Sequence, residues 1–231
     1  MPGPQGADQR GGRIRTTGPI GAETDNGTEA ELSYDAFKQA VLDAQIRGKR
    51  AEGKTFFAAV PATELDVIEG SFRMRKLAAL RCRQLLADVR SALETETRAD
   101  DGSAVLVTHI GIQSAYRDYA QDMRAWEKAF KTHYNKTLAA RESLEGGPHG
   151  RAALQVLVRR MRKFKAPPGF SNHSNGTAVD FNTTQDGTEF VADSSQREGW
   201  KQTWLHRWLV MHAATYGFHP LATEEWHWDF K

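Results

Sequence analysis

The sequence has little cysteine and no long apolar run, and each absence excludes a class of structure. Cys82 is the only cysteine among 231 residues, so the chain forms no intramolecular disulfide and offers no thiolate-rich metal site. The pattern KLAALRCRQLLADV around it predicts a buried thiol in a helix. A transmembrane helix needs about 18 or more consecutive apolar residues. The chain has no such run, so no membrane span is expected.

The chain also lacks an excess of charge of either sign. Its 31 basic and 29 acidic residues give a net charge of +2, which indicates a mixed surface. The helical pattern over residues 71–96 carries several basic side chains, but acidic side chains follow in the same segment. We therefore interpret it as a solvated face and expect no nucleic acid as partner.

The first 30 residues are almost free of large apolar side chains. Such a segment buries too little surface to offset the entropy lost on ordering, so residues 1–30 are predicted to be a disordered leader. The same stretch lacks the apolar core of a secretory signal peptide. We therefore expect synthesis in the cytoplasm without a Sec-type signal.

Apolar periodicity divides the remaining chain into helices and short strands. Ser33 precedes the first helical pattern and is a candidate N-cap, and Leu77, Leu80, Leu85 and Val89 recur at helical spacing in the second. Helices are predicted over residues 32–50, 71–96, 113–130, 151–164 and 200–218. Strands are predicted over residues 103–112, 177–184, 188–193 and 224–230. This order predicts an α+β fold in which helices pack against a small antiparallel sheet, with a helical N-terminal region over residues 31–100.

The stretch SNHSNGTAVDF over residues 171–181 places a histidine and an aspartate around a turn that leads into a strand. Gly176 allows a sharp turn between His173 and Asp180. Strand alternation puts Asp180 on the same face as Ala178, where a carboxylate is costly to bury unless a cation meets it. His173 and Asp180 are therefore either ligands of one metal ion or parts of a polar turn, and this stretch alone leaves both open.

A second chemical signal is the stretch TEEWHW near the end of the chain. Regular alternation would place His227 and Glu225 on one face of a strand, and Glu224 and Trp226 on the other. A glutamate near a metal-binding histidine is what a general base requires, and the spacing does not choose between the two glutamates. Trp228 is expected in the core, whereas Trp226 either walls a pocket or packs in the core.

Four stretches together resemble the motifs of one peptidase family, in that family's order. SNHSNGTAVDF resembles a Ser-x-His-x-x-Gly-x-Ala-x-Asp signature, and TEEWHW resembles a Glu-x-Trp-His motif. QSAYRDYAQ resembles a Ser-x-Tyr-Arg motif, and TWLHRWLVMHAATYGF resembles the helix that precedes the last strand. Residues 103–231 thus resemble the zinc D-alanyl-D-alanine carboxypeptidases that include VanY and VanX. These LAS peptidases share their fold with the hedgehog signalling domain.

The resemblance implies roles for individual residues. It implies one Zn²⁺ ion held by His173, Asp180 and His227, with Glu224 as the general base. Arg117 would stabilise the oxyanion that develops at the scissile carbonyl. The candidates for binding substrate are Ser171, Gln121, Ser114, Tyr116 and Trp226.

The resemblance also implies a function for residues 101–231 as a zinc peptidase catalytic domain. The leading hypothesis is a D-alanyl-D-alanine carboxypeptidase that hydrolyses peptidoglycan stem peptides by Glu-assisted attack of zinc-bound water. The alternatives are an L,D-carboxypeptidase, an endolysin-type endopeptidase, and a non-catalytic zinc-stabilised binding module of a phage or contractile injection system. The presence of both Glu224 and Arg117 favours an enzyme. A cell-wall substrate predicts action in the periplasm or outside the cell, after lysis or non-Sec delivery by a phage, injection or secretion machinery.

Three departures from the family pattern carry their own expectations. Glu225 stands where the family usually has proline, and its charge is expected to raise the pKa of the neighbouring base. The segment between Arg117 and Ser171 is longer than usual for the family, and LEGGPHG within it is predicted to be an exposed loop that lines the substrate site. The first hundred residues match no family motif, and they form either a helical cap on the catalytic domain, which we favour, or a wall-binding or targeting module.

Overall fold

The computed structural model describes residues 31–99 and 102–231, so the predicted leader over residues 1–30 lies outside the described residues. The helices are α1 (Tyr34–Ala51), α2 (Lys76–Arg98), α3 (Tyr119–Glu142), α4 (Arg151–Phe164), α5 (Asn172–Asn175), α6 (Arg197–Gln202) and α7 (Trp204–His212). The strands are β1 (Leu65–Glu69), β2 (Phe72–Arg75), β3 (Val107–Ser114), β4 (Ala178–Gln185), β5 (Thr188–Phe190), β6 (Phe218–Leu221) and β7 (Glu224–Phe230). Short 3₁₀ helices are η1 (Ala62–Glu64), η2 (Gly102–Leu106), η3 (Ser194–Gln196) and η4 (Ala213–Tyr216). The predicted α+β class is confirmed.

The larger sheet has the strand order β3-β4-β7-β6, with β5 paired to the outer part of β4. Its pairings are antiparallel, as predicted. The register sets Ser114 of β3 opposite Asp180 of β4, and Asp180 opposite His227 of β7. Three neighbouring strands therefore bring their polar side chains to one place in the sheet.

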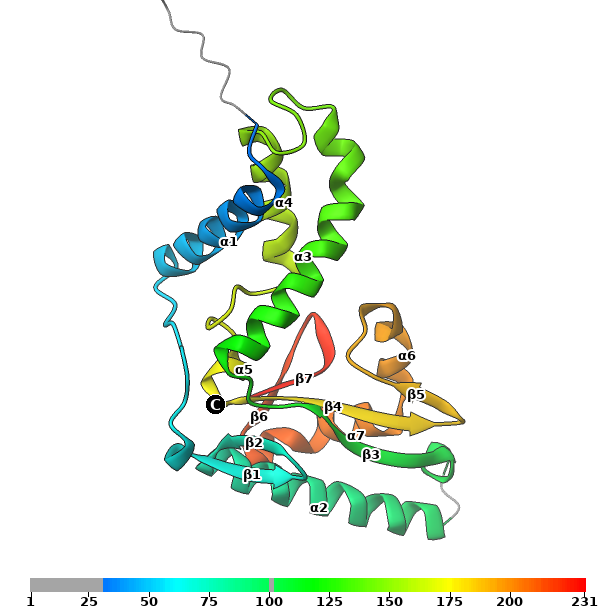
Figure 1. Cartoon of the computed structure of the whole chain (residues 1–231). Helices are drawn as coiled ribbons and strands as arrows, with labels where there is room; N and C mark the ends of the chain where they lie inside the picture. Colours follow the sequence, from blue (N-terminus) through cyan, green and yellow to red (C-terminus); the bar gives the residue numbers. More distant parts are fainter. Residues whose placement is uncertain (1–30, 100–101) are drawn as a thin grey trace, which may run out of the picture.

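One face of this sheet is covered by α2 and α7, which Figure 1 shows below the strands. The buried stripe of α2 includes Cys82, which is fully buried as predicted, together with Leu85 and Val89. Leu77 and Leu80 are 57% and 43% exposed, so the helical spacing that they share with Leu85 and Val89 does not mark the buried face of α2. The helix packs instead through the stripe that Ala78, Ala79, Cys82, Leu85, Leu86 and Val89 form.

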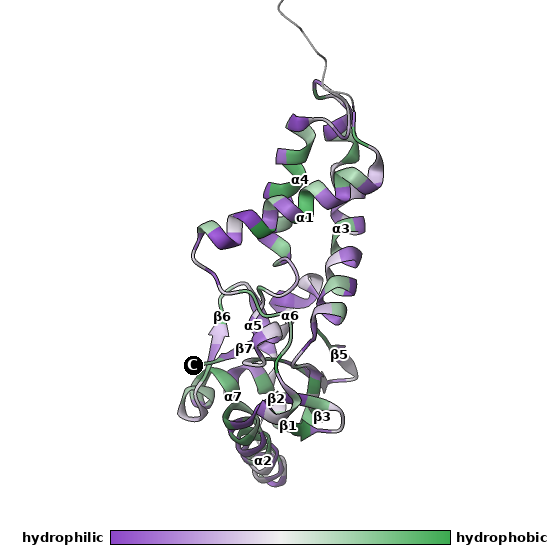
Figure 2. Cartoon of the chain, turned by 60° about the vertical axis from the view of Figure 1, so that its left-hand side comes forward, coloured by the Kyte–Doolittle hydropathy of each residue, from purple (hydrophilic) through white to green (hydrophobic). Residues whose placement is uncertain are grey.

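A separate helical unit of α1, α3 and α4 stands above the other face of the sheet (Figure 1). Figure 2 shows the same two units one above the other, with polar residues over the outer turns of these helices. Ser33 caps α1 as predicted, because its Oγ accepts a hydrogen bond from the Ala36 N–H at 3.2 Å. The core of this unit consists of Phe37, Val41, Leu42, Trp126, Phe130, Ala153, Leu157 and Met161.

The loop over residues 144–150 joins α3 to α4 at the end of the helical unit remote from the sheet (Figure 1). His149 stacks on Phe37 with 4.8 Å between ring centroids, and its Nδ1 lies 2.8 Å from the carbonyl oxygen of Leu32. Most of the loop is half-buried against the start of α1. The prediction of an exposed loop that lines the substrate site is therefore wrong, because tertiary contacts hold the loop elsewhere.

Other differences concern the bounds of elements. Residues 72–75 form β2 rather than the first turn of a helix, and the β1–β2 hairpin and β6 were not predicted. The strand expected over residues 103–112 begins only at Val107, after η2. The helix expected over residues 200–218 is divided at Thr203, whose backbone is extended and whose Oγ accepts from the His206 N–H.

The segment of residues 31–100 contributes to both units. α1 belongs to the core of the helical unit, whereas α2 belongs to the core beneath the sheet. The division at residue 100 stays a prediction, as does the cap role for the preceding segment. Within the described residues, no helix combines the length and apolarity that a membrane span requires.

Candidate active site

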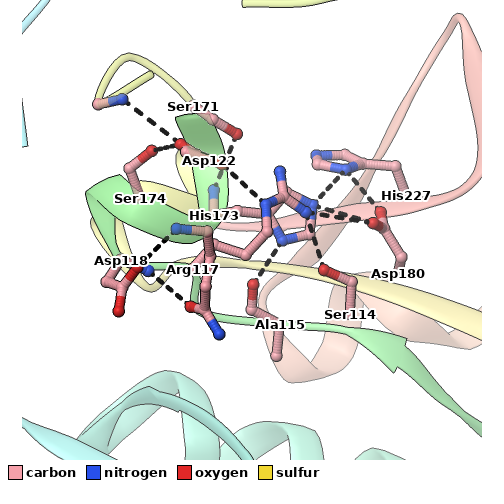
Figure 3. Close-up of polar contacts among 12 residues, drawn as sticks. Ser114, Ala115, Arg117, Asp118, Asp122, Ser171, His173, Ser174, Asp180 and His227 are labelled. Atoms are coloured by element: carbon pink, nitrogen blue, oxygen red, sulfur yellow. Dashed lines mark hydrogen bonds and ion pairs between the residues drawn. The ribbon is translucent and has the colours of Figure 1, made fainter. Parts of the chain in front are cut away.

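Three buried side chains from three elements converge on one point (Figure 3). His173 comes from α5, Asp180 from β4 and His227 from β7. His173 Nε2 lies 3.2 Å from Asp180 Oδ2, and His227 Nδ1 lies 2.9 Å from Asp180 Oδ1. The two facing ring nitrogens, His173 Nε2 and His227 Nδ1, are 3.2 Å apart. The structure thus brings together the three residues for which a ligand role was predicted.

Local sequence explains why the first histidine turns toward the sheet. Ser171 Oγ accepts a hydrogen bond from the His173 N–H at 3.2 Å and caps the single turn of α5. Gly176 ends that turn at a φ of 74°, a left-handed conformation that glycine adopts without strain. The chain then enters β4, whose pairing with β7 sets Asp180 opposite His227. Ser171 therefore has a structural role in the site, whatever its contact with substrate.

The other nitrogen of each imidazole is already engaged, and this fixes which lone pairs face inward. His173 Nδ1 lies 2.7 Å from the Ala115 carbonyl oxygen, which only accepts, so this nitrogen is the donor. His227 Nε2 lies 2.9 Å from Asp229 Oδ1. In the neutral tautomers both inward nitrogens present lone pairs, and neither can donate to the other. Two imidazole nitrogens and one carboxylate facing the same point form a donor set that fits Zn²⁺.

The pKa values of these three residues show how the charges of the cluster balance one another. Burial lowers the pKa of His173 below its ordinary value. Burial also opposes the charged form of His227, but hydrogen bonds to Asp180 and Asp229 raise its pKa to about 10. Burial alone would raise the pKa of Asp180, whereas the neighbouring His173 and His227 hold it far below its usual range. A proton on His227 thus compensates the negative charges of Asp180 and Asp229.

Glu224 lies at the edge of this cluster. Its Oε2 is 4.0 Å from His227 Nδ1, and its side chain is 38% exposed. Glu224 therefore lies beside the three ligand candidates without belonging to their group.

Glu225 takes a different direction. Its carboxylate is 3.0 Å from Arg197 Nε and 3.7 Å from Lys201 Nζ. Burial would raise the pKa of Glu225, but the hydrogen bond from Arg197 outweighs it and lowers the pKa. The predicted sharing of one face by Glu225 and His227 is wrong, because the β6–β7 pairing shifts register between Pro220 and Leu221. The charge of Glu225 is compensated by these two cations.

Arg117 is held beside the metal-ligand candidates by several contacts (Figure 3). Its Nε donates to Asp122 Oδ1 at 2.8 Å and its Nη1 donates to Ser114 Oγ at 2.8 Å. The same Nη1 lies 3.8 Å from Asp180 Oδ2. Asp122 is 2% exposed and also accepts a hydrogen bond from the hydroxyl of Ser174. Burial would raise the pKa of Asp122, but its contacts with Arg117 lower it.

The residues predicted to bind substrate fall into two groups. Ser114, Tyr116 and Gln121 line an open cavity of about 240 Å³ together with Arg117 and the start of β2. Tyr116 also accepts a hydrogen bond from the Val60 N–H, and Gln121 completes the capping box of α3. Trp226 is separate from this group, because it is 5% exposed and belongs to the core cluster beneath the sheet.

Sequence reasoning missed three charged residues of the site. Asp229 contacts His227 from the same strand, and its position two residues later on the same face was a usable signal. Asp122 follows Arg117 within the first turn of α3 and was hidden by its place in a helix. Burial and the charge of Arg117 lower the pKa of Lys165, at the end of α4, whereas the charges of Asp122, Asp180 and Glu224 oppose this effect. Nothing in the sequence around Lys165 singled it out.

Residues 84–231 match the sequence model of a family described as "VanY: D-alanyl-D-alanine carboxypeptidase". This match spans more than half of the chain. The chain belongs to the VanY family. The motif resemblance is therefore confirmed, and with it the class of zinc-dependent carboxypeptidases, hydrolases that act on peptidoglycan.

Several solved structures are similar to the chain at low identity. A VanY D,D-pentapeptidase from a VanB-type vancomycin resistance cassette, in complex with Zn(II), is 20% identical with a TM-score of 0.45, over 74% of this chain and 82% of that chain. The LD-carboxypeptidase LdcB is 21% identical with a TM-score of 0.43, over 74% and 69%. An L,D-carboxypeptidase DacB from Streptococcus pneumoniae is 17% identical with a TM-score of 0.36, over 76% and 85%. No curated protein sequence matches the chain.

Proposed function

We propose that this VanY-family chain is a D-alanyl-D-alanine carboxypeptidase that removes the last residue of peptidoglycan stem pentapeptides. The observation that carries the proposal is that Arg117 lies 3.8 Å from Asp180 and Glu224 lies 4.0 Å from His227, both members of the His173–Asp180–His227 cluster. A zinc-stabilised binding module needs neither residue in that position. The family match supports the same reaction class.

We assign His173, Asp180 and His227 as the residues that would hold one Zn²⁺ ion. Bound there, the ion would act as a Lewis acid toward the scissile carbonyl and would acidify a water molecule. Two neutral imidazoles and one carboxylate leave a net positive charge at the site, which suits both tasks. Asp229 keeps the Nε2 proton on His227 and so directs Nδ1 inward.

Glu224 is proposed as the general base. A carboxylate 4.0 Å from a ligand nitrogen reaches an attacking water without binding the metal itself. It takes the proton of that water as the carbon–oxygen bond forms, and then delivers it to the nitrogen of the departing D-alanine. Its partial exposure leaves it free to approach the substrate.

Arg117 is proposed to stabilise the negative charge that develops on the carbonyl oxygen. Its guanidinium is always charged and is fixed by Asp122 and Ser114, so it needs little reorganisation during the reaction. Such a preorganised donor is commonly worth about 3–4 kcal/mol of transition-state stabilisation. Ser114, Tyr116 and Gln121 line the adjacent cavity and are proposed to contact the stem peptide.

The substrate implies a place of action outside the cytoplasm, on the cell wall. We propose that the chain reaches it after lysis or through a phage, injection or secretion machinery. Fractionation of cells that express the native chain tests this step. Recovery from the periplasm or medium of intact cells, with an upstream signal peptide cleaved off, would contradict it.

Mass spectrometry of defined muropeptides tests the reaction. Pentapeptides that end in D-Ala-D-Ala should lose one alanine, tetrapeptides should remain intact, and both Glu224→Gln and a chelator should abolish the loss. Loss of alanine from tetrapeptides only would reassign the chain as an L,D-carboxypeptidase, and cleavage within the stem would indicate an endopeptidase. No cleavage by the zinc-loaded chain would favour the binding module.

A further inference from the structure

The β1–β2 hairpin contacts the turn that carries His173 (Figure 1). Arg75, the last residue of β2, donates its backbone N–H to the Gly176 carbonyl at 2.9 Å. Its Nε donates to the Asn175 carbonyl at 2.8 Å, and its Nη2 donates to Asn175 Oδ1 at 3.1 Å. Asn175 is the last residue of α5, and Gly176 is the C-cap of that helix. Arg75 therefore holds the end of α5, directly after His173, through its backbone and its side chain.

The fit between Arg75 and this turn is close and favours arginine. A Cβ atom on Gly176 would lie 3.3 Å from the Arg75 backbone nitrogen and 3.4 Å from its Cγ, so a side chain there would crowd the hairpin. On its other side, the guanidinium pairs with Glu64 through Nη1. The planar guanidinium thus serves both acceptors of Asn175 from one fixed fork, which the single ammonium of a lysine does less well.

The same strand supports the segment on the other side of His173. The Arg73 carbonyl accepts a hydrogen bond from the Tyr116 N–H at 2.9 Å. The His173 carbonyl accepts from the Arg117 N–H at 3.2 Å. His173 Nδ1 donates to the Ala115 carbonyl at 2.7 Å, and this bond sets the direction of the imidazole (Figure 3). β2 therefore contacts both segments on which the orientation of His173 depends.

We propose that Arg75 is a positioning residue of the active site, which fixes the end of α5 and keeps His173 Nε2 directed at the other two ligand candidates. In this role it acts through Asn175 and Gly176 rather than on the substrate itself. The inference rests on the proposed role of His173 as a zinc ligand, and it names the residue that holds that ligand in its orientation. Arg75 precedes residue 84, where the family match begins, so the β1–β2 hairpin is part of the active site although it lies outside that match.

Hydrogen exchange of the metal-free full chain, followed by NMR, tests this assignment. The N–H groups of residues 175–177 close the turn by donating back to the carbonyls of residues 171–173. Arg75→Met removes the guanidinium donors, so these turn amides should exchange about tenfold faster than in the unaltered chain. The slowest amides of α2, which report global unfolding, should change far less. Arg73→Met is the matched control, because Arg73 is exposed on the same strand and keeps its carbonyl.

Zinc affinity gives a second readout. Competition with a chromophoric chelator should show about 10- to 100-fold weaker binding by Arg75→Met than by Arg73→Met, and Arg75→Lys should recover part of the affinity. Asn175→Ala should also weaken binding. Adding it to Arg75→Met should cost little more, because both changes remove the same contact. Glu64→Gln should have almost no effect, because the contact of Glu64 with Arg75 is exposed.

The outcomes separate this inference from the proposed function. If the unaltered chain binds zinc but cleaves no peptide, the proposed function fails, and weaker zinc binding by Arg75→Met still supports the inference. If it binds no zinc, faster exchange of the turn amides in Arg75→Met supports the positioning of His173.

Turn amides that exchange at the same rate in Arg75→Met and Arg73→Met overturn the inference. An equal acceleration of the turn amides and the α2 amides also overturns it, because Arg75 would then contribute to global stability alone. If Arg75→Met does not fold, Arg75→Lys and Asn175→Ala provide the same comparison against Arg73→Met.

Discussion

At the scale of single residues, the site depends on an imidazole held between two carboxylates. His227 contacts Asp180 through Nδ1 and Asp229 through Nε2, both at 2.9 Å. The contact with Asp180 lies within the group of ligand candidates, whereas the contact with Asp229 sets the orientation of the imidazole ring. Carboxylates that orient a ligating histidine in this way raise its basicity and hold its tautomer.

Asp229→Asn is expected to weaken zinc binding without unfolding the chain. The amide keeps the shape of the side chain but loses the charge that favours the Nε2 proton of His227, so the affinity should fall by about 10- to 100-fold. Competition with a chromophoric chelator measures this change. Asp186→Asn, in the turn between β4 and β5, is the control, and equal affinities of the two variants would refute the role of Asp229.

The raised pKa of His227 predicts that zinc uptake releases a proton. Because this pKa is about 10 in the metal-free fold, against an ordinary 6.5, His227 carries a proton at pH 7 that the metal must displace. Calorimetric titrations at pH 7 in buffers of different ionisation enthalpy should show the release of about one proton per zinc. A binding enthalpy independent of the buffer would contradict this assignment.

The same pKa fixes the direction of the pH effect on the metal-free chain. A raised folded pKa stabilises the fold fully below the ordinary value of 6.5, and the contribution is lost as the pH rises through about 10. Denaturant midpoints of the metal-free chain should therefore fall over that alkaline range. His227→Gln should remove this part of the pH dependence.

At the scale of elements, the loop between α3 and α4 is fixed by a buried arginine. Arg141 is fully buried, donates to the carbonyls of Pro148 and Tyr134, and lies 4.1 Å from the centroid of the Tyr134 ring. These contacts tie the turn before α4 to the body of α3 and place a cation over aromatic faces. The hairpin of α3 and α4 is thus closed at the end remote from the active site.

Arg141→Ala is expected to destabilise the helical unit strongly. It removes the hydrogen bonds to two half-buried carbonyls and leaves a cavity, which together should cost about 3 kcal/mol of unfolding free energy. Urea denaturation measures the loss, and Arg151→Ala on the exposed face of α4 is the control. A loss below about 0.5 kcal/mol would contradict the role of Arg141.

Sequence patterns predicted most elements and missed those that depend on tertiary contacts. The histidines and Asp180 were found because each lies in a recognisable stretch, and α1 and α4 because their apolar periodicity is long. The β1–β2 hairpin was missed because its strands are short and rich in charge. The loop with His149 was placed wrongly, because its position is set by Phe37, which is far away in the sequence. Lys165 and Asp122 acquire their neighbours only in the fold.

At the scale of the whole molecule, the active site lies between the sheet unit and the helical unit. The sheet supplies Asp180 and His227, and the start of α3 carries Asp122, which holds Arg117. At the C-terminal end of α4, the backbone carbonyl of Lys165 accepts a hydrogen bond from Gln45 of α1. The family match begins at residue 84, within α2, so α1 and the β1–β2 hairpin lie outside it. This arrangement gives the segment before residue 84 a part in shaping the site.

Titration of zinc into the metal-free chain, followed by the release of D-alanine from a defined pentapeptide, tests the central claim most directly. The account predicts that the rate rises in proportion to added zinc and stops rising at one ion per chain. Glu224→Gln should bind the same one ion and release no D-alanine. Stoichiometric zinc binding by the unaltered chain without release of D-alanine would contradict the account.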